Sequence, residues 1–195
     1  VFSMKKILVL DFSPRKKGNC ASLTKVMAEE ISAKGGEAVC FAGRDIDVKP
    51  CKGCNACKKK DTAFCVQKDD FTAMLPLLDE CDGIAFAAPV YVGHVPGPAK
   101  TFIDRLYCFF NPGRKEPLFT VKDSKKIAVL LPCGGGDPAA YSPIGDWVGK
   151  SFGMVGVTEH RVAVRNGLND LWDPEEENRK AYAEEAKKLA DWLME

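Results

Sequence analysis

The sequence predicts an α/β protein built on a doubly wound, five-stranded parallel sheet, and three observations lead to this fold class. Five short apolar runs are bounded by turn-forming residues, as expected for strands buried on both faces. Amphipathic stretches with helical spacing separate these runs. The alternation continues along the whole chain without an internal repeat, which indicates parallel strands joined by helical crossovers.

The strands are predicted at 5–13, 37–42, 83–90, from 125 into a glycine-rich loop ending at 137, and 155–164. The intervening helices are predicted at 20–36, about 69–80, 98–110, 141–154 and 173–195. Gly35 and Gly36 supply a stop for the first helix, and Asp69 and Asp70 a cap for the second. Pro98 suits the first turn of the third helix.

Composition favours a single globular domain over residues 1–195, with a cysteine-rich loop at 49–68. Hydrophobic residues make up 46% of the chain and charged residues 28%, while the formal net charge is only +1. This balance argues against nucleic acid or a membrane surface as a partner. No apolar run approaches the ~20 residues of a membrane span, and from the residues ahead of the first strand we expect no secretory signal. We therefore expect a cytoplasmic protein with reduced cysteines.

Three loops follow predicted strands, at the sheet edge where α/β proteins bind ligands. The first, "DFSPRKKGNCAS" (11–22), offers side-chain donors from Ser13, Asn19 and Ser22 beside a helix N-terminus, which suits a phosphate. It matches neither G-x-G-x-x-G nor the P-loop pattern, so a nucleoside triphosphate is disfavoured. The alternative for this loop is a polar turn with a helix cap.

The other two loops suit a planar ligand. "APVYVGHVPG" (88–97) has Pro and Gly residues that hold the backbone irregular, and Tyr91 and His94 can stack on a ring or donate to it. A lone histidine such as His94 is more often an ordinary loop residue than a catalytic one. The glycines of "PCGGGD" (132–137) leave backbone amides free to meet a ring edge. Each loop is a weak signal, but all three at one sheet edge indicate a binding site.

The segments "SPRKKGN", "CKGC-x2-C" and "PVYVGHVPGPAKTFIDR" resemble the NADPH-dependent FMN reductase group of the flavodoxin-like superfamily, and within it the iron–sulfur flavoproteins. The resemblance implies a three-layer αβα fold with strand order 2-1-3-4-5. It implies an FMN phosphate held by Ser13, Arg15, Asn19, Cys20 and Ser22. The isoalloxazine would then be bordered by Pro89, Val90, Tyr91, Val92, Gly93 and His94, and on its other side by Cys133, Gly134, Gly135 and Gly136.

The cysteine segment "KPCKGCNACKKKDTAFC" (49–65) admits four readings for Cys51, Cys54, Cys57 and Cys65. A structural zinc site usually has two separated pairs, and disulfides are disfavoured in a reducing compartment. A cluster-free loop would use the thiols for packing or oxidant sensing. A [4Fe–4S] cluster commonly takes its ligands from a C-x2-C-x2-C run, and the resemblance implies this use.

Positive charge around the segment supports the cluster, because a thiolate-bound cluster is anionic. The lysines concerned are Lys49, Lys52, Lys58, Lys59 and Lys60, although a solvated basic loop is the alternative. The remaining cysteines are expected to be buried small hydrophobes, with Cys20 and Cys133 near the flavin.

We therefore expect an FMN-dependent oxidoreductase in which no residue acts as nucleophile or general base. With a cluster, electrons would come from a ferredoxin-like donor and pass singly to FMN and a small-molecule acceptor. Without one, NAD(P)H would deliver hydride to FMN directly, and a quinone would be a typical acceptor. A non-enzymatic electron carrier and a redox sensor are further alternatives. We expect a homodimer or homotetramer that covers the cysteine loop, with "LYCFFNPG" (106–113) as a candidate interface.

Overall fold

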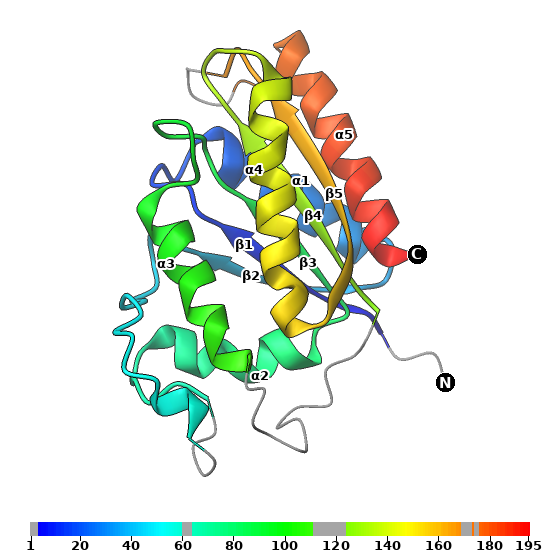
Figure 1. The fold of residues 1–195 in the computed structure, drawn as a ribbon. Helices are drawn as coiled ribbons and strands as arrows, with labels where there is room; N and C mark the ends of the chain where they lie inside the picture. The colour runs from blue at the N-terminus through cyan, green and yellow to red at the C-terminus, as the bar shows by residue number, and fades with distance from the viewer. Residues whose placement is uncertain (1–3, 60–63, 111–123, 169–172, 174–175) are drawn as a thin grey trace.

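A computed structural model describes residues 4–59, 64–110, 124–168, 173 and 176–195 (Figure 1). Its five strands form one parallel sheet with the order β2-β1-β3-β4-β5, as predicted. The strands are β1 (Lys6–Asp11), β2 (Glu37–Ala42), β3 (Gly83–Ala87), β4 (Lys125–Pro132) and β5 (Val157–Arg165). The helices are α1 (Asn19–Ala33), α2 (Asp70–Glu80), α3 (Gly97–Arg105), α4 (Pro138–Ser151) and α5 (Glu177–Met194), with short 3₁₀ turns η1 (Ala56–Lys58), η2 (Leu106–Phe109) and η3 (Phe152–Val155).

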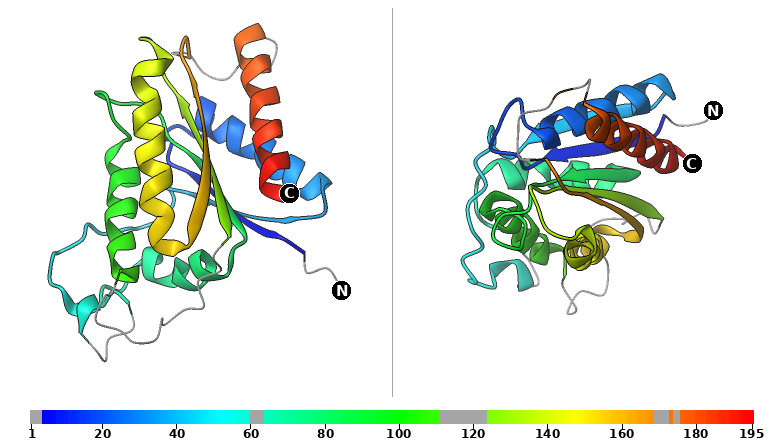
Figure 2. Two further views of the ribbon diagram at one scale, coloured as in Figure 1. Left: turned by 45° about the vertical axis from the view of Figure 1, so that its right-hand side comes forward. Right: turned by 90° about the horizontal axis from the view of Figure 1, so that it is seen from above.

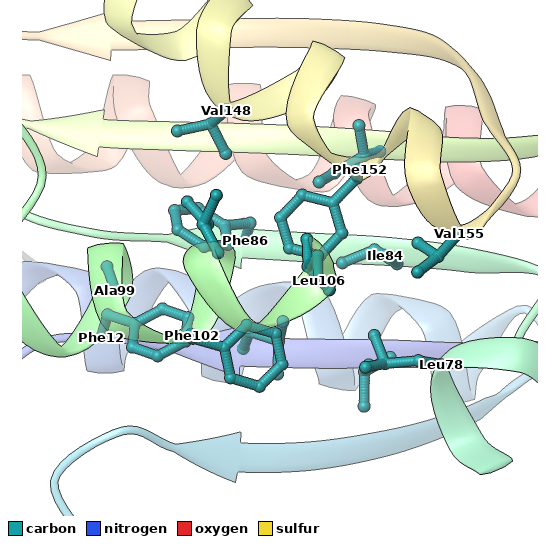
Figure 3. Close-up of a cluster of buried hydrophobic side chains, with 14 of the residues drawn as sticks. Phe12, Leu78, Ile84, Phe86, Ala99, Phe102, Leu106, Val148, Phe152 and Val155 are labelled. Carbon is teal, nitrogen blue, oxygen red and sulfur yellow. The ribbon is translucent and has the colours of Figure 1, made fainter. Parts of the chain in front are cut away.

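Helices cover both faces of the sheet, which gives the predicted three layers (Figure 2). One face carries α1 and α5, whose apolar side chains share a core with β1, β3 and β4. The other face carries α2, α3 and α4 over a second core. Figure 3 shows this second core, where Phe12 lies 5.1 Å from Phe86 and 5.4 Å from Phe102 between ring centroids. No helix among the described residues is both long and apolar enough to cross a membrane.

Element ends differ from the predicted ranges where local chemistry decides them. The helix predicted at 98–110 ends as α3 at Arg105 and continues as the 3₁₀ turn η2. The helix predicted from 141 begins at Pro138, because the carboxylate of Asp137 caps it by accepting from the Ala139 N–H at 2.9 Å. The predicted cap of α2 is confirmed, since the Asp69 carboxylate accepts from the Thr72 N–H at 3.2 Å.

A buried ion pair closes the base of the cysteine loop. The two Nη atoms of Arg105 donate to the two carboxylate oxygens of Asp69 at 2.5 and 3.1 Å, with both side chains at most 1% exposed. The same carboxylate accepts from the Lys49 N–H at 3.0 Å, and Arg105 donates to the Lys49 carbonyl at 2.7 Å. The ion pair therefore fixes the start of the cysteine loop by binding both the N–H and the carbonyl of Lys49.

The Asp69 pKa reflects this network. Burial of the carboxyl raises the pKa, but the hydrogen bonds from Arg105, the Lys49 N–H and Thr72 outweigh it and lower the pKa from 3.8 to about 2. The ionised form is thus favoured by folding. Its contribution to stability is fully present above the unfolded pKa near 3.8 and is lost as pH falls through about 2.

Replacing this carboxylate should remove part of the acid sensitivity of the fold. In the native chain, we expect Asp69 to account for about 2 kcal/mol of unfolding free energy lost between pH 5 and pH 1. Asp69→Asn should be less stable at pH 7 and should lose less stability on acidification. Urea unfolding at several pH values measures this, with Asp104→Asn in an exposed pair as the control. An unchanged acid dependence in Asp69→Asn would contradict the assignment.

Candidate flavin site and cysteine cavity

A cavity of about 320 Å³ lies at the carboxyl edge of the sheet, where α1 begins. It is lined by the loops that follow β1, β3, β4 and β5. The lining residues are Ser13, Arg15, Gly18, Asn19, Cys20, Pro89, Val90, Tyr91, Pro132, Cys133, Gly134 and Leu168. The three loops singled out in the sequence therefore share one cavity, and a fourth loop joins them.

The first loop is folded tightly on itself. The Ser13 hydroxyl accepts from the Arg15 N–H at 3.1 Å and donates to the Arg15 carbonyl at 3.2 Å. At Gly18, a Cβ atom would lie 3.0 Å from the Ser13 Oγ, so glycine lets the backbone pass close to this turn. Beneath the loop, the Asp11 carboxylate is paired with Arg44 at 2.5 Å. The pairing offsets negative charge below a site predicted to take a phosphate.

The N-terminus of α1 gives the cavity a surface suited to an anion. The first N–H groups of a helix have no partners within the helix, and the first turn of α1 holds no acidic residue. Cys20 is buried there, and burial raises the pKa of its thiol well above 9.0, with the charge of Asp11 acting in the same direction. The thiol is thus neutral at pH 7 and adds no negative charge.

The side chain of Asn19 is engaged by other parts of the protein. Its side-chain amide donates to the Leu168 carbonyl at 3.1 Å, and its oxygen accepts from Arg179 Nε at 3.3 Å. The side chain thereby ties the first loop to the segment after β5 and to α5. Any contact from Asn19 to a phosphate would come chiefly from its backbone.

The second loop turns sharply at its tip. Tyr91 and His94 form an antiparallel bridge, and both residues between them have positive φ, 51° at Val92 and 74° at Gly93. A β-branched residue rarely adopts this conformation. Tyr91 reaches the cavity rim, whereas His94 packs edge-on against Trp147 with ring centroids 4.9 Å apart.

The glycine loop is fastened to the segment after β5, which the sequence reasoning did not consider. The Gly167 N–H donates to the Gly134 carbonyl at 3.2 Å, and the Leu168 N–H to the Cys133 carbonyl at 3.0 Å. Leu168 thus enters the cavity wall. The signal for it was available, because "RNGL" (165–168) follows the fifth strand at the same sheet edge.

The cavity gathers most of the predicted flavin residues. Those that line it are Ser13, Arg15, Asn19, Cys20, Pro89, Val90, Tyr91, Cys133 and Gly134. The predicted residues that are not among its lining are Ser22, Val92, Gly93, His94, Gly135 and Gly136. Gly18, Pro132 and Leu168 line it without having been predicted. The roles of individual residues toward FMN stay predictions.

A second cavity lies beneath the cysteine loop. All four predicted ligands line it, namely Cys51, Cys54, Cys57 and Cys65, together with Cys108 from η2. Cys51 and Cys54 are exposed, while Cys57 and Cys65 are half-buried. Left-handed backbone at Gly53 and Asn55 turns the loop between the first three cysteines. Among the described residues, no three His, Cys, Asp or Glu side chains are already grouped closely enough to hold a metal ion.

The positive charge at this cavity differs from the sequence expectation. Lys52 lines the cavity, but Lys58 donates to the carbonyls of Tyr107 and Phe110 and lies over the Tyr107 ring at 3.6 Å. Lys58 therefore fastens the loop to η2 rather than facing the thiols. Lys60 lies outside the described residues.

Arg105 is the buried cation of the cavity wall, and the sequence reasoning missed it. Its guanidinium interacts favourably with the Cys65 thiol, and its Nε–H is buried with no oxygen or nitrogen acceptor among the described residues. A buried donor of this kind is costly unless an acceptor is present. Four thiols, a buried cation and an unused donor at one cavity fit the requirements of an anionic, sulfur-rich cluster.

Strain at the tip of the second loop gives a testable consequence. Left-handed backbone costs an L-residue roughly 1–2 kcal/mol, and the Val92 side chain is fully exposed, so it gains no packing in return. Val92→Gly should raise the free energy of unfolding by up to about 1 kcal/mol after the added chain entropy of glycine. Val92→Ala keeps a Cβ atom, so its free energy of unfolding should rise less than that of Val92→Gly. Chemical denaturation measures both, and a destabilised glycine variant would contradict the strain.

Comparison with known proteins shows the family to which this chain belongs. Residues 5–169 match the family model for NADPH-dependent FMN reductase. An iron-sulfur flavoprotein of Methanosarcina thermophila is 32% identical over 96% of this chain and 95% of its own. An iron-sulfur flavoprotein of Archaeoglobus fulgidus is 42% identical over 80% of this chain and 75% of its own.

Solved structures agree on the fold. The NAD(P)H:quinone oxidoreductase from Methanothermobacter marburgensis has a TM-score of 0.76 at 14% identity, covering 99% of this chain and 98% of that one. An azoreductase from Bacillus anthracis has a TM-score of 0.71 at 21% identity, covering 97% and 100%. The chain belongs to the NADPH-dependent FMN reductase family of flavodoxin-like proteins, close to the iron–sulfur flavoproteins, and is an FMN-dependent oxidoreductase.

Proposed function

We propose that this oxidoreductase holds a [4Fe–4S] cluster in the cysteine cavity and passes electrons singly between it and FMN to a small acceptor. The observation that carries the proposal is the shared cavity of Cys51, Cys54, Cys57 and Cys65 with the buried Arg105. Binding would require the four sulfur atoms to draw together around one centre. The names of the related iron-sulfur flavoproteins support the same assignment.

FMN is assigned to the cavity at the sheet edge. Its phosphate would be held by the N-terminus of α1 with Ser13 and Arg15, and its ring would lie between Pro89–Tyr91 and Cys133–Gly134. When bound, FMN accepts either a hydride or single electrons. The protein's part is to orient the ring with the loops after β3 and β4 and to exclude water with Leu168 and the prolines.

The physiological donor under this proposal is a low-potential protein of the ferredoxin class. Tyr107 and Phe110 are exposed beside the cysteine loop, so an apolar contact surface adjoins the proposed cluster. The same surface is suited to a second copy of this chain, and a homodimer or homotetramer would shield the cluster from water. The setting is the cytoplasm, where thiols stay reduced.

A cluster-free reductase is the second candidate. The observation that favours it is that no metal-binding group is assembled among the described residues. NAD(P)H would then reduce FMN directly, and a quinone is a typical acceptor, as the name of the Methanothermobacter marburgensis protein indicates for that enzyme. Rapid flavin reduction by NADPH, with no response to reduced ferredoxin, would favour this candidate. Reduction by ferredoxin without turnover of a small acceptor would instead indicate an electron carrier.

Iron content should depend on the cysteine loop and on no other exposed thiol. Cys57→Ser, purified without oxygen, should lose most of its iron while retaining FMN, because serine is a poor ligand for this cluster. Cys40→Ser is the matched control, since Cys40 is exposed on β2 away from the loop. Inductively coupled plasma spectrometry measures the iron, flavin absorbance measures the FMN, and together they give the ratio of iron to FMN. Equal iron in both variants would overturn the assignment of these ligands.

FMN affinity should depend on the close backbone approach at Gly18. In Gly18→Ala, the added Cβ would lie 3.0 Å from Ser13 Oγ and 3.1 Å from Arg15 Cβ, so the loop after β1 must shift by a few tenths of an ångström. We expect the dissociation constant for FMN to rise about tenfold, equivalent to ~1.4 kcal/mol. Gly153→Ala meets no described atom within 4 Å and should bind normally. Fluorescence titration of apoprotein measures both, and equal affinities would contradict the assigned phosphate loop.

A further inference from the structure

We propose that Arg105 is a positioning residue for the cysteine cavity, which holds the Cys65 thiolate and raises the reduction potential of the cluster bound there. The inference rests on the proposed function, because it concerns the cluster assigned to this cavity. It goes further in naming a residue that is neither a cysteine nor part of the cysteine loop. Arg105 ends α3 and reaches the loop from a neighbouring element.

The position of Arg105 is set by three contacts that leave its guanidinium little freedom. Two Nη atoms engage the Asp69 carboxylate, and one also donates to the Lys49 carbonyl at 2.7 Å. The Phe71 ring lies against the guanidinium, with its centroid 4.7 Å from Cζ. A planar guanidinium held in this way has a fixed direction, unlike the flexible ammonium of a surface lysine.

The hydrogen bonds to Asp69 and Lys49 use the two Nη atoms of the guanidinium and do not involve Nε. The Nε–H is buried with no oxygen or nitrogen acceptor among the described residues, and the guanidinium interacts instead with the Cys65 sulfur. The residue lines the cysteine cavity, and its charge acts favourably on the Cys65 thiol. A thiolate or a cluster sulfide in this cavity would supply the missing acceptor. Unused donor, buried charge and cysteine sulfur therefore meet on one wall.

The other charges near the cavity act more weakly. Lys52 is exposed, so water screens its charge. Asp104 also lines the cavity, but its carboxylate is paired with Lys100 at 2.5 Å. Asp69 neutralises part of the Arg105 charge from the side that carries Nη. The cavity itself faces Arg105, and a buried cation there favours whichever redox state carries the extra electron.

One-electron reduction adds a negative charge to the cluster, with the electron supplied by the chemical reductant of the titration. Removing Arg105 should therefore disfavour the reduced state. Because Arg105→Gln alone would leave Asp69 buried and unpaired, the informative variant is Asp69→Asn combined with Arg105→Gln. We expect its equilibrium constant for cluster reduction to fall at least tenfold, which corresponds to a potential at least 59 mV lower.

Two further variants separate this effect from loss of structure. Arg105→Lys keeps the positive charge and its pairing with Asp69, so the equilibrium constant for cluster reduction should fall less than threefold. Lys125→Met removes a different buried cation, which donates to the Leu78 and Asp79 carbonyls at 2.7 and 2.6 Å at the opposite end of α2. It should lower stability without moving the potential.

The experiment is an anaerobic redox titration of each holoprotein, followed by electron paramagnetic resonance of the reduced cluster. A tenfold weaker reduction in the double variant alone supports the inference, as does loss of iron from that variant with FMN retained. A double variant that reduces like the native protein overturns the inference and leaves the proposed function standing. An equal shift in Lys125→Met also overturns it. Native protein without iron overturns both.

Discussion

The buried pair between Asp69 and Arg105 joins the cysteine loop to the rest of the fold. Asp69 caps α2, Arg105 ends α3, and together they hold both backbone groups of Lys49 at the entry to the loop. Buried ion pairs often add little net stability, because desolvation offsets the charge attraction. Their geometry is nevertheless fixed. The pair places the cysteine loop against the end of α3 and provides a cation beside the thiols.

The cavity proposed for FMN depends on different contacts, at the carboxyl edge of the sheet. Parallel strands end at one edge of the sheet, and this brings together four loops that are far apart in the sequence. Asn19 then fastens the loop after β1 to the segment after β5 and to α5. The two proposed redox centres thus lie in loops that rigid helices and strands position, while the cofactors supply the chemistry.

Local patterns were enough to predict the alternation of strands and helices and the Asp69 cap, because hydrophobic periodicity and capping act within a few residues. The strand order and the three layers were predicted from the resemblance to flavodoxin-like proteins. The same patterns indicated that the loops after the strands would meet at one edge of the sheet, where the placement of FMN stays a prediction. Leu168 follows a predicted strand and could have been included, whereas Arg105 and the use of Lys58 could not be predicted in this way. Each depends on which element packs against a loop, and a helix-end arginine in "FIDR" has no sequence feature that reveals the cysteines beside it. The roles of these residues follow from tertiary contacts of the cysteine loop.

The central claim is that the cysteine cavity holds a cluster that exchanges electrons with FMN. Its most direct test is the iron and acid-labile sulfide content per FMN of native protein that has never met oxygen. The account predicts about four iron and four sulfide per flavin, as a [4Fe–4S] centre requires. Stoichiometric FMN without iron or sulfide would contradict it, and would leave a flavin reductase whose cysteine loop serves packing or oxidant sensing.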